Sequence, residues 1–172
     1  WPAGVTLEET PRANFVKHIQ PLLEENCVSC HTPDKHKGDW IITTKKQAFE
    51  TGESTPNIVP FDLEKSAAYH LTTLPADDDD VMPPKKSGGP LGKDQITMLK
   101  LWILQGAPWP DDVKLAPKEK KSTGANNPDT IELVKKIHDF IVATSKEKTE
   151  AEMKEYSNKI PKTSAPYTML AI

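Results

Sequence analysis

Apolar residues recur at helical spacing in three stretches of the first 112 residues of the 172-residue chain. The first stretch begins near residue 12 and leads to Cys27, and its apolar stripe consists of Phe15, Ile19, Leu22 and Leu23. Pro21 interrupts this stripe, so we expect the helix to kink or restart there. The pattern predicts an amphipathic, proline-broken helix that ends close to Cys27.

The other two stretches cover residues 63–74 and 91–106. The second of these has the clearest apolar face in the chain, formed by Ile96, Leu99, Leu101, Trp102, Ile103 and Leu104. Gly106 is a typical C-terminal stop, and Pro108 prevents continuation. A further helical turn is predicted at residues 45–50. We therefore expect a mainly helical domain in which the helix at 91–106 crosses the first helix.

The pattern changes towards the C-terminus, where a basic, polar segment is followed by new helical spacing. An aspartate-led capping box at residues 129–132 begins this part, and a second box at residues 149–152 predicts another short helix that ends near Tyr156. The chain closes on an apolar run, so we expect a further domain beyond Ile172. The predicted organisation is a domain at residues 1–112, a linker at 113–128 and a helical extension at 129–172.

The strongest chemical signal lies at residues 27–31, which read Cys-Val-Ser-Cys-His. This is the attachment signature of a c-type haem. Two thiols three positions apart reach two vinyl groups on one haem edge and form thioethers with them. His31 is then held under the iron as the proximal ligand. Cys27 and Cys30 are the only cysteines in the chain.

Other uses of this motif fit the sequence less well. A redox dithiol normally opens a helix after a strand, whereas this motif closes a predicted helix. A zinc site would use His31 and His36 with the two thiols, but adjacent Cys30 and His31 suit one tetrahedral centre poorly. A disulfide of this span is unusual. Covalent haem c, one per chain, is the favoured interpretation.

Met82 is the candidate for the second axial ligand. It stands between the aspartate run at residues 77–80 and two prolines, in a segment that cannot be helical. Such a rigid loop presents a side chain to a ligand position, and His/Met ligation raises the reduction potential of the iron. His70, in the helix at 63–74, is the main rival. His36 in a polar loop and His18 on the first helix read as solvated surface residues.

Composition limits the possible partners. The chain has 22 basic and 25 acidic residues, well mixed, and a formal net charge of −3. This balance argues against binding to nucleic acid or to an anionic membrane surface. No apolar run reaches membrane-spanning length. Because only 36% of residues are hydrophobic, we expect the haem to form part of the core, with the apolar stretch at residues 39–44 packed against it.

The expected compartment follows from the haem. The chain starts at Trp1 without a signal peptide, and we interpret it as a mature or trimmed chain. Covalent attachment through two cysteines takes place outside the bacterial cytoplasm. The protein is therefore expected to be periplasmic or otherwise exported.

The order of these motifs resembles the planctomycete-type cytochrome c domain over about residues 14–110. The residues that carry the resemblance are Pro21-Leu22-Leu23, the motif at 27–31, Gly38, Ser66, Met82-Pro83-Pro84, Trp102-Ile103 and Gly106-Ala107-Pro108-Trp109-Pro110. The resemblance implies an all-α, class I cytochrome c-like fold around one covalent haem. It also implies that Cys27 and Cys30 hold the haem, with His31 proximal and Met82 distal.

A second similarity concerns the C-terminal tail. Residues 156–172 are similar to the lead-in of a formylglycine-generating-enzyme (sulfatase-modifying factor) domain. No catalytic residue of such a domain lies in this chain, so the similarity carries no site residue.

These observations favour a non-enzymatic, mono-haem module that passes single electrons to a redox partner the sequence does not identify. Two alternatives remain. A haem sensor or small peroxidase-like enzyme would need a displaceable Met82 and distal acid/base residues, for which His36 and His70 are the candidates. A structural docking module would depend more on the helices after Asp129 than on the iron.

Overall fold

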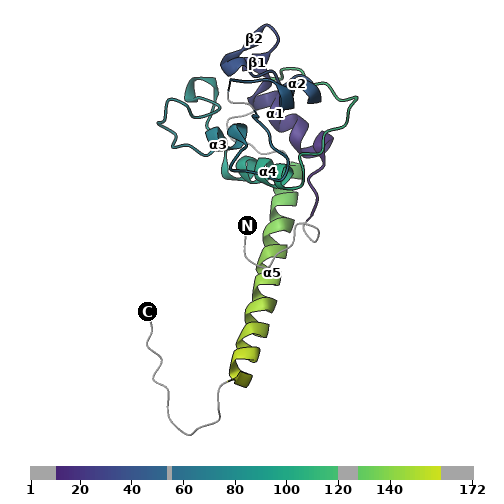
Figure 1. The fold of residues 1–172 in the computed structure, drawn as a ribbon, viewed down its shortest axis with the longest axis vertical. Coiled ribbons are helices and arrows are strands. Elements are labelled where there is room, and N and C mark those ends of the chain that lie inside the picture. Colours follow the sequence, from purple (N-terminus) through teal and green to yellow (C-terminus); the bar gives the residue numbers. More distant parts are fainter. Residues whose placement is uncertain (1–10, 54–55, 120–127, 160–172) are drawn as a thin grey trace.

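The computed structural model describes residues 11–53, 56–119 and 128–159, with side chains of the last segment described as far as residue 143. Most elements gather in one helical body, and the last helix extends away from it (Figure 1). The described α-helices are α1 Gln20–Asn26, α2 Lys45–Glu50, α3 Ala67–Thr72, α4 Lys93–Leu104 and α5 Pro128–Lys159. The similarity noted for the C-terminal tail concerns residues that lie almost entirely outside this description.

The first helix breaks where Pro21 predicts. A π-helical turn, η1 Phe15–Ile19, runs into α1, which begins at Gln20 with the proline in its first turn. Proline has no N–H to donate and its ring clashes with the preceding turn, so the helix changes its hydrogen-bonding register there. The Asn14 side chain caps η1 by accepting a hydrogen bond from the Lys17 N–H. The prediction of a restarted helix is confirmed.

The position of His18 off the apolar stripe predicts a surface residue, and this prediction is wrong. Its side chain is buried, and its Nδ1 accepts a hydrogen bond of 2.9 Å from the Asn14 N–H. The wider π turn and the packing of α5 against η1 account for this difference. The imidazole therefore works as a backbone cap inside the fold.

The core is built around α4. Met98, Leu101, Trp102 and Ile103 of this helix are almost fully buried, and Gly106 follows with φ +91°, a conformation that glycine readily adopts. The predicted turn at residues 45–50 is confirmed as α2, and α4 agrees with the predicted helix at 91–106.

Helix α3 is shorter than the apolar spacing at residues 63–74 predicts. Ser66 precedes it and is fully buried. The Ser66 hydroxyl donates to the carbonyls of Val59 and Asp62 and accepts from the Val59 N–H. Serine competes for backbone groups in this way at turns, so the chain before Ala67 forms a side-chain-bonded turn in place of the first helical turn.

The fold is mainly helical but includes one small sheet in the described residues. Strands β1 His31–Thr32 and β2 Lys35–His36 pair in antiparallel register, with His31 opposite His36. The 3-10 helices η2 Val28–Cys30, η3 Lys37–Asp39 and η4 Lys85–Ser87 complete the elements. The sequence gives no strand pattern here, because two-residue strands are too short to show alternation.

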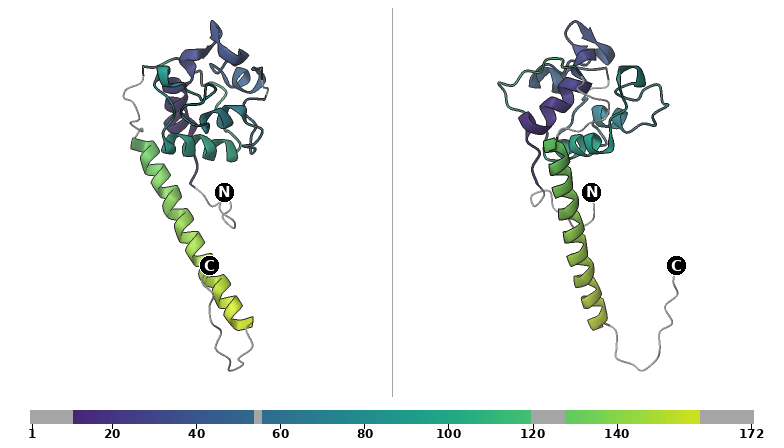
Figure 2. Two further views of the ribbon diagram at one scale, coloured as in Figure 1. Left: turned by 90° about the vertical axis from the view of Figure 1, so that its left-hand side faces the viewer. Right: turned by 180° about the vertical axis from the view of Figure 1, so that it is seen from behind.

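Helix α5 is one continuous helix where the two capping boxes predicted two. It begins at Pro128, so Asp129 lies in its first turn, and it passes through residues 149–152 without a break. Its first turns pack against α4 and η1 through buried Thr130, Leu133 and Ile137, and the remainder projects from the body (Figure 2). None of the described helices combines the length and the apolar character needed to cross a membrane.

The start of the expected linker also lies against the helical body. Leu115 is buried, and its N–H donates to the Thr43 carbonyl over 2.9 Å. Lys118 makes an ion pair of 2.5 Å with the buried carboxylate of Glu24 on α1. Burial raises the pKa of Glu24, but the hydrogen bonds from Lys118, Gln20 and the Ala116 N–H outweigh it, so the net pKa is lowered.

Candidate functional site

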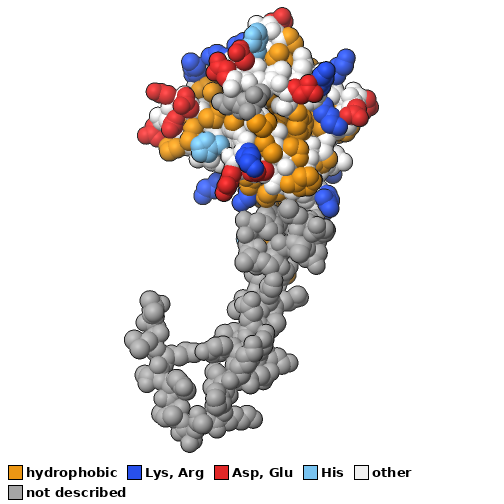
Figure 3. Space-filling view, viewed as in Figure 1, with side chains coloured by type: hydrophobic (Ala, Val, Ile, Leu, Met, Phe, Trp, Pro, Cys, Tyr) orange, Lys and Arg blue, Asp and Glu red, His pale blue; other side chains and the backbone are white. Residues whose placement is uncertain are grey.

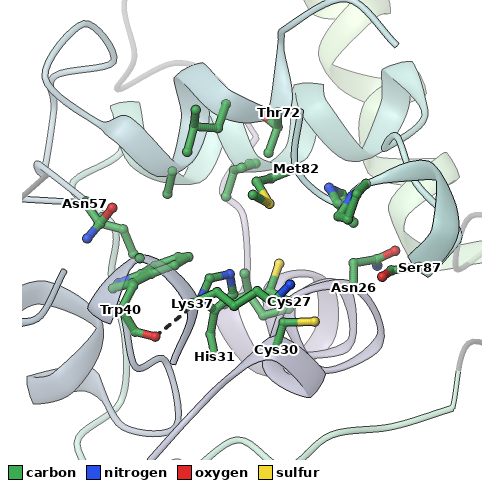
Figure 4. A pocket seen from close by; sticks show the side chains of 18 of the residues that line it. Asn26, Cys27, Cys30, His31, Lys37, Trp40, Asn57, Thr72, Met82 and Ser87 are labelled. Carbon is green, nitrogen blue, oxygen red and sulfur yellow. Dashed lines mark hydrogen bonds between the residues drawn. The ribbon is translucent and has the colours of Figure 1, made fainter. Parts of the chain in front are cut away.

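A cavity of about 350 Å³ lies between the end of α1 and the loop that carries Met82. Its walls bring together Cys27, Cys30, His31 and Met82, the four residues that the sequence singled out. Figure 4 shows the two cysteines and His31 on one side of the cavity and Met82 on the opposite side. The volume lies within the range of small-molecule and cofactor pockets.

The first side of the cavity is fixed by the end of α1. Cys27 caps this helix, and its N–H donates to the Leu23 carbonyl over 2.8 Å. The chain then tightens into η2, where buried Val28 anchors the turn and the Cys30 N–H donates to the Cys27 carbonyl. Both thiols are half-buried at the cavity wall. The helix end therefore presents two thiols and the following histidine to one space.

The orientation of His31 depends on Trp40. The His31 Nδ1 lies 3.2 Å from the Trp40 carbonyl oxygen. The two rings lie 5.0 Å apart between centroids with an interplanar angle of 59°. The Trp40 indole is itself held by a hydrogen bond of 2.9 Å from its Nε1 to the Ala48 carbonyl on α2. With Nδ1 donating to a carbonyl, Nε2 is left as the basic nitrogen of the ring.

The protonation state of His31 suits a metal ligand. Burial lowers the pKa of this imidazole, while the carbonyls of Trp40 and Lys37 oppose the shift and nearby Lys35 and Lys37 add to it. The net pKa is below the ordinary value of histidine. The neutral ring that follows is the form that binds metals.

The opposite side of the cavity is formed by the Met82 loop. The Met82 N–H donates to the Leu71 carbonyl over 3.0 Å, which ties the loop to α3. Val81 and Pro83 on either side are buried. The half-buried Met82 side chain is therefore held at the cavity wall by its backbone neighbours.

The other histidines that we weighed as ligands lie outside the cavity. His70 is exposed on α3, and His36 is exposed on β2 with its Nδ1 2.9 Å from the Pro33 carbonyl oxygen. Neither lines the cavity. Within the described part of the chain, no group of three or more His, Cys, Asp or Glu side chains is placed to hold a metal ion.

The cavity fits a haem by its chemistry. Apolar side chains make up much of its wall, among them Leu23, Ile58, Leu71, Leu99 and Trp102. Two thiols, a neutral imidazole and a thioether are the protein groups that c-type haem ligation uses. Polar residues that sequence reasoning missed, Asn26 and Asn57, also line the cavity and are buried. Nothing in their sequence context marked them, although Asn26 directly precedes Cys27.

Fold and site together define the class: a small helical domain with a cavity between a C-x-x-C-H turn and a methionine loop. Residues 27–86 match the family described as Planctomycete cytochrome C. Over this stretch the match confirms the resemblance seen in the sequence: this part of the chain is similar to a c-type cytochrome domain, a class that binds haem c. The flanking residues that carried the resemblance, 14–26 and 87–110, lie outside the matched stretch.

Two further comparisons gave no match. No curated protein and no solved structure is significantly similar to this chain.

Proposed function

We propose that the domain carries single electrons on one haem c bound covalently by Cys27 and Cys30, with His31 as proximal ligand and Met82 as distal ligand. The observation that supports this most directly is the arrangement of the four residues on facing walls of one cavity. The match to a cytochrome c family over residues 27–86 supports the choice of cofactor.

Each residue has a separate task in this proposal. The iron of a bound haem stores one electron. Cys27 and Cys30 fix the haem edge against α1, and His31 binds with its basic Nε2 because Nδ1 is directed at the Trp40 carbonyl. Met82 would hold the haem from the cavity wall opposite His31, where its thioether would favour reduced iron and raise the potential. No substrate pocket is needed for this function.

Alternative enzymatic or sensing functions have less support. They require acid/base groups beside an open iron position, and the two histidines considered for that role, His36 and His70, are exposed and away from the cavity. A purely structural docking function would leave the arrangement of thiols, imidazole and thioether unexplained.

The wider setting is also proposed. The covalent haem implies that the protein is exported, in a bacterium to the periplasm, and we propose that the domain is a module of a larger protein with residues 1–112, 113–128 and 129–172 as its parts. Its partner is another redox protein. Basic and acidic side chains are mixed on the face shown in Figure 3, so this face does not specify the charge of the partner's surface.

The experiment is expression in a host that matures c-type cytochromes, followed by haem staining after denaturing electrophoresis and a redox titration. The proposal predicts one haem that stays with the denatured chain and one reversible one-electron transition. Variant Cys30→Ser should retain at most a single thioether. A haem lost on denaturation, or haem-free protein, would contradict covalent attachment.

A further inference from the structure

The loop that carries Met82 folds back on itself at Gly89. A Cβ atom added to Gly89 would lie 1.8 Å from the carbonyl oxygen of Pro83 and 2.5 Å from its carbonyl carbon. Both are backbone atoms, so no side-chain rotation relieves the overlap. The close approach of residues 83 and 89 therefore requires the absence of a side chain at position 89.

Backbone hydrogen bonds hold this close approach in place. The Gly89 N–H donates to the Pro84 carbonyl over 3.2 Å, and the Ser87 N–H donates to the same carbonyl over 2.8 Å. The Gly88 N–H donates to the Lys85 carbonyl over 3.0 Å. The segment from Pro83 to Gly89 is thus a closed unit, in which a movement of Gly89 is coupled to a movement of Pro83.

Both ends of this unit are anchored to helices. The Met82 N–H is bonded to the Leu71 carbonyl at the end of α3. On the other side Leu91 is buried, and the Gly92 N–H donates to the Gln95 side chain of α4 over 2.9 Å. Because the α4 end is fixed by a core side chain, extra volume at Gly89 displaces Pro83 and, with it, Met82.

We propose that Gly89 is a positioning residue for the distal ligand: its missing side chain allows the loop to hold the Met82 thioether facing His31. This inference rests on the proposed function, in which Met82 binds the haem iron. It adds a residue that touches neither haem nor iron in that proposal but determines whether the sixth ligand is in place.

The test compares Gly89→Ala with Gly92→Ala in the haem-loaded protein. A Cβ at Gly92 meets nothing closer than the Gln95 Oε1 at 3.7 Å, an ordinary contact, so the same chemical change there is a matched control. We expect Gly89→Ala to keep its covalent haem, to lose the methionine–iron charge-transfer band of the oxidised form, and to bind carbon monoxide when reduced. Gly92→Ala should behave as wild type in all three measurements.

Coupling to Met82 separates positioning from general damage. In a Met82→Leu background, Gly89→Ala should change neither the reduction potential nor carbon monoxide binding further, because its effect passes through the absent thioether. A Gly89→Ala protein that keeps the methionine band and stays closed to carbon monoxide would overturn the inference. So would an additive effect in the double variant.

If Gly89→Ala yields no folded protein, hydrogen exchange of the wild type gives the answer. The amides of Met82 and Gly89 should open together, with the same protection, because the Met82–Leu71 bond anchors the closed unit that contains the Gly89–Pro84 bond. Independent exchange of the two amides would overturn the inference. A wild-type protein without a methionine band would instead overturn the proposed ligation by Met82, so the two failures are distinguishable.

Discussion

Met82 and Met98 are the same residue type in two different environments. Met98 is fully buried in α4, whereas Met82 is half-buried at the cavity wall on a loop fixed to α3. Only the second is placed facing His31. The sequence context of Met82, aspartates before it and prolines after it, was sufficient to mark it as a candidate ligand.

This difference gives a prediction with a matched control. Met82→Leu should keep the covalent haem but lower the reduction potential, because a thioether that favours the reduced iron is lost. Met98→Leu conserves volume in the core, costs less than about 1.5 kcal/mol of stability, and should leave the potential unchanged. Potentiometric titration of both variants checks this, and equal potentials for Met82→Leu and wild type would exclude Met82 as a ligand.

His18 gives a prediction about pH. Burial lowers its pKa, the charge of Lys17 lowers it further, and Asp129 opposes these effects. Below about pH 6.5 the unfolded chain therefore takes up a proton that the native state does not. Stability conferred by the neutral ring is present above that pH and is lost as the pH falls towards the lowered native pKa, with a slope of at most about 1.4 kcal/mol per pH unit.

Denaturant unfolding between pH 7 and pH 5 measures this slope. His18→Gln removes the titrating group but keeps an acceptor for the Asn14 N–H, so the slope should decrease. His70→Gln, at an exposed position on α3, is the control substitution. An unchanged slope in His18→Gln would show that another group is responsible.

At the scale of elements, single residues such as proline and glycine correctly predicted where helices break and end. Pro21 and Gly106 mark a break and an end that the structure has, and the turn at residues 45–50 is present as α2. The small β1–β2 sheet was not predicted because two-residue strands are too short to show alternation. The buried position of His18 was not predicted because it depends on the packing of α5 against η1. The capping box at residues 149–152 was overridden by continuation of α5.

Helix α5 gives the element-scale prediction. Ile137 is 3% exposed where α5 meets the body, whereas Ile131 on the same helix is 49% exposed. Ile137→Ala should destabilise the helical body by about 2–4 kcal/mol, and Ile131→Ala should change its stability by about 0.5 kcal/mol or less. Thermal unfolding of the two variants tests whether α5 stabilises the helical body. Equal effects of the two variants would argue against packing of α5 on this body.

At the scale of the whole molecule, the cavity is large for a domain with so few apolar residues. Apolar side chains make up much of the cavity wall, and without a bound cofactor this apolar surface would face water, which disfavours the folded state. We therefore expect the double variant Cys27→Ala, Cys30→Ala to fail to fold, as judged by loss of cooperative unfolding. A stably folded, haem-free double variant would contradict a core role for the cofactor.

The identities of the four cavity residues were available from the sequence, because the C-x-x-C-H spacing and the Met-Pro-Pro segment are local motifs. Their meeting at one site was also expected from the haem motif and the resemblance, but the support that His31 receives from Trp40 and the close approach at Gly89 were not predicted. Those two features depend on the backbone path of short loops, which the residue pattern does not specify.

The central claim is that His31 and Met82 close both axial positions of one covalent haem. The most direct measurement is the near-infrared and visible spectrum of the oxidised protein, followed by addition of carbon monoxide to the reduced protein. The account predicts a methionine–iron charge-transfer band and no binding of carbon monoxide. Absence of the band together with ready binding would contradict it and would favour an open, ligand-binding haem.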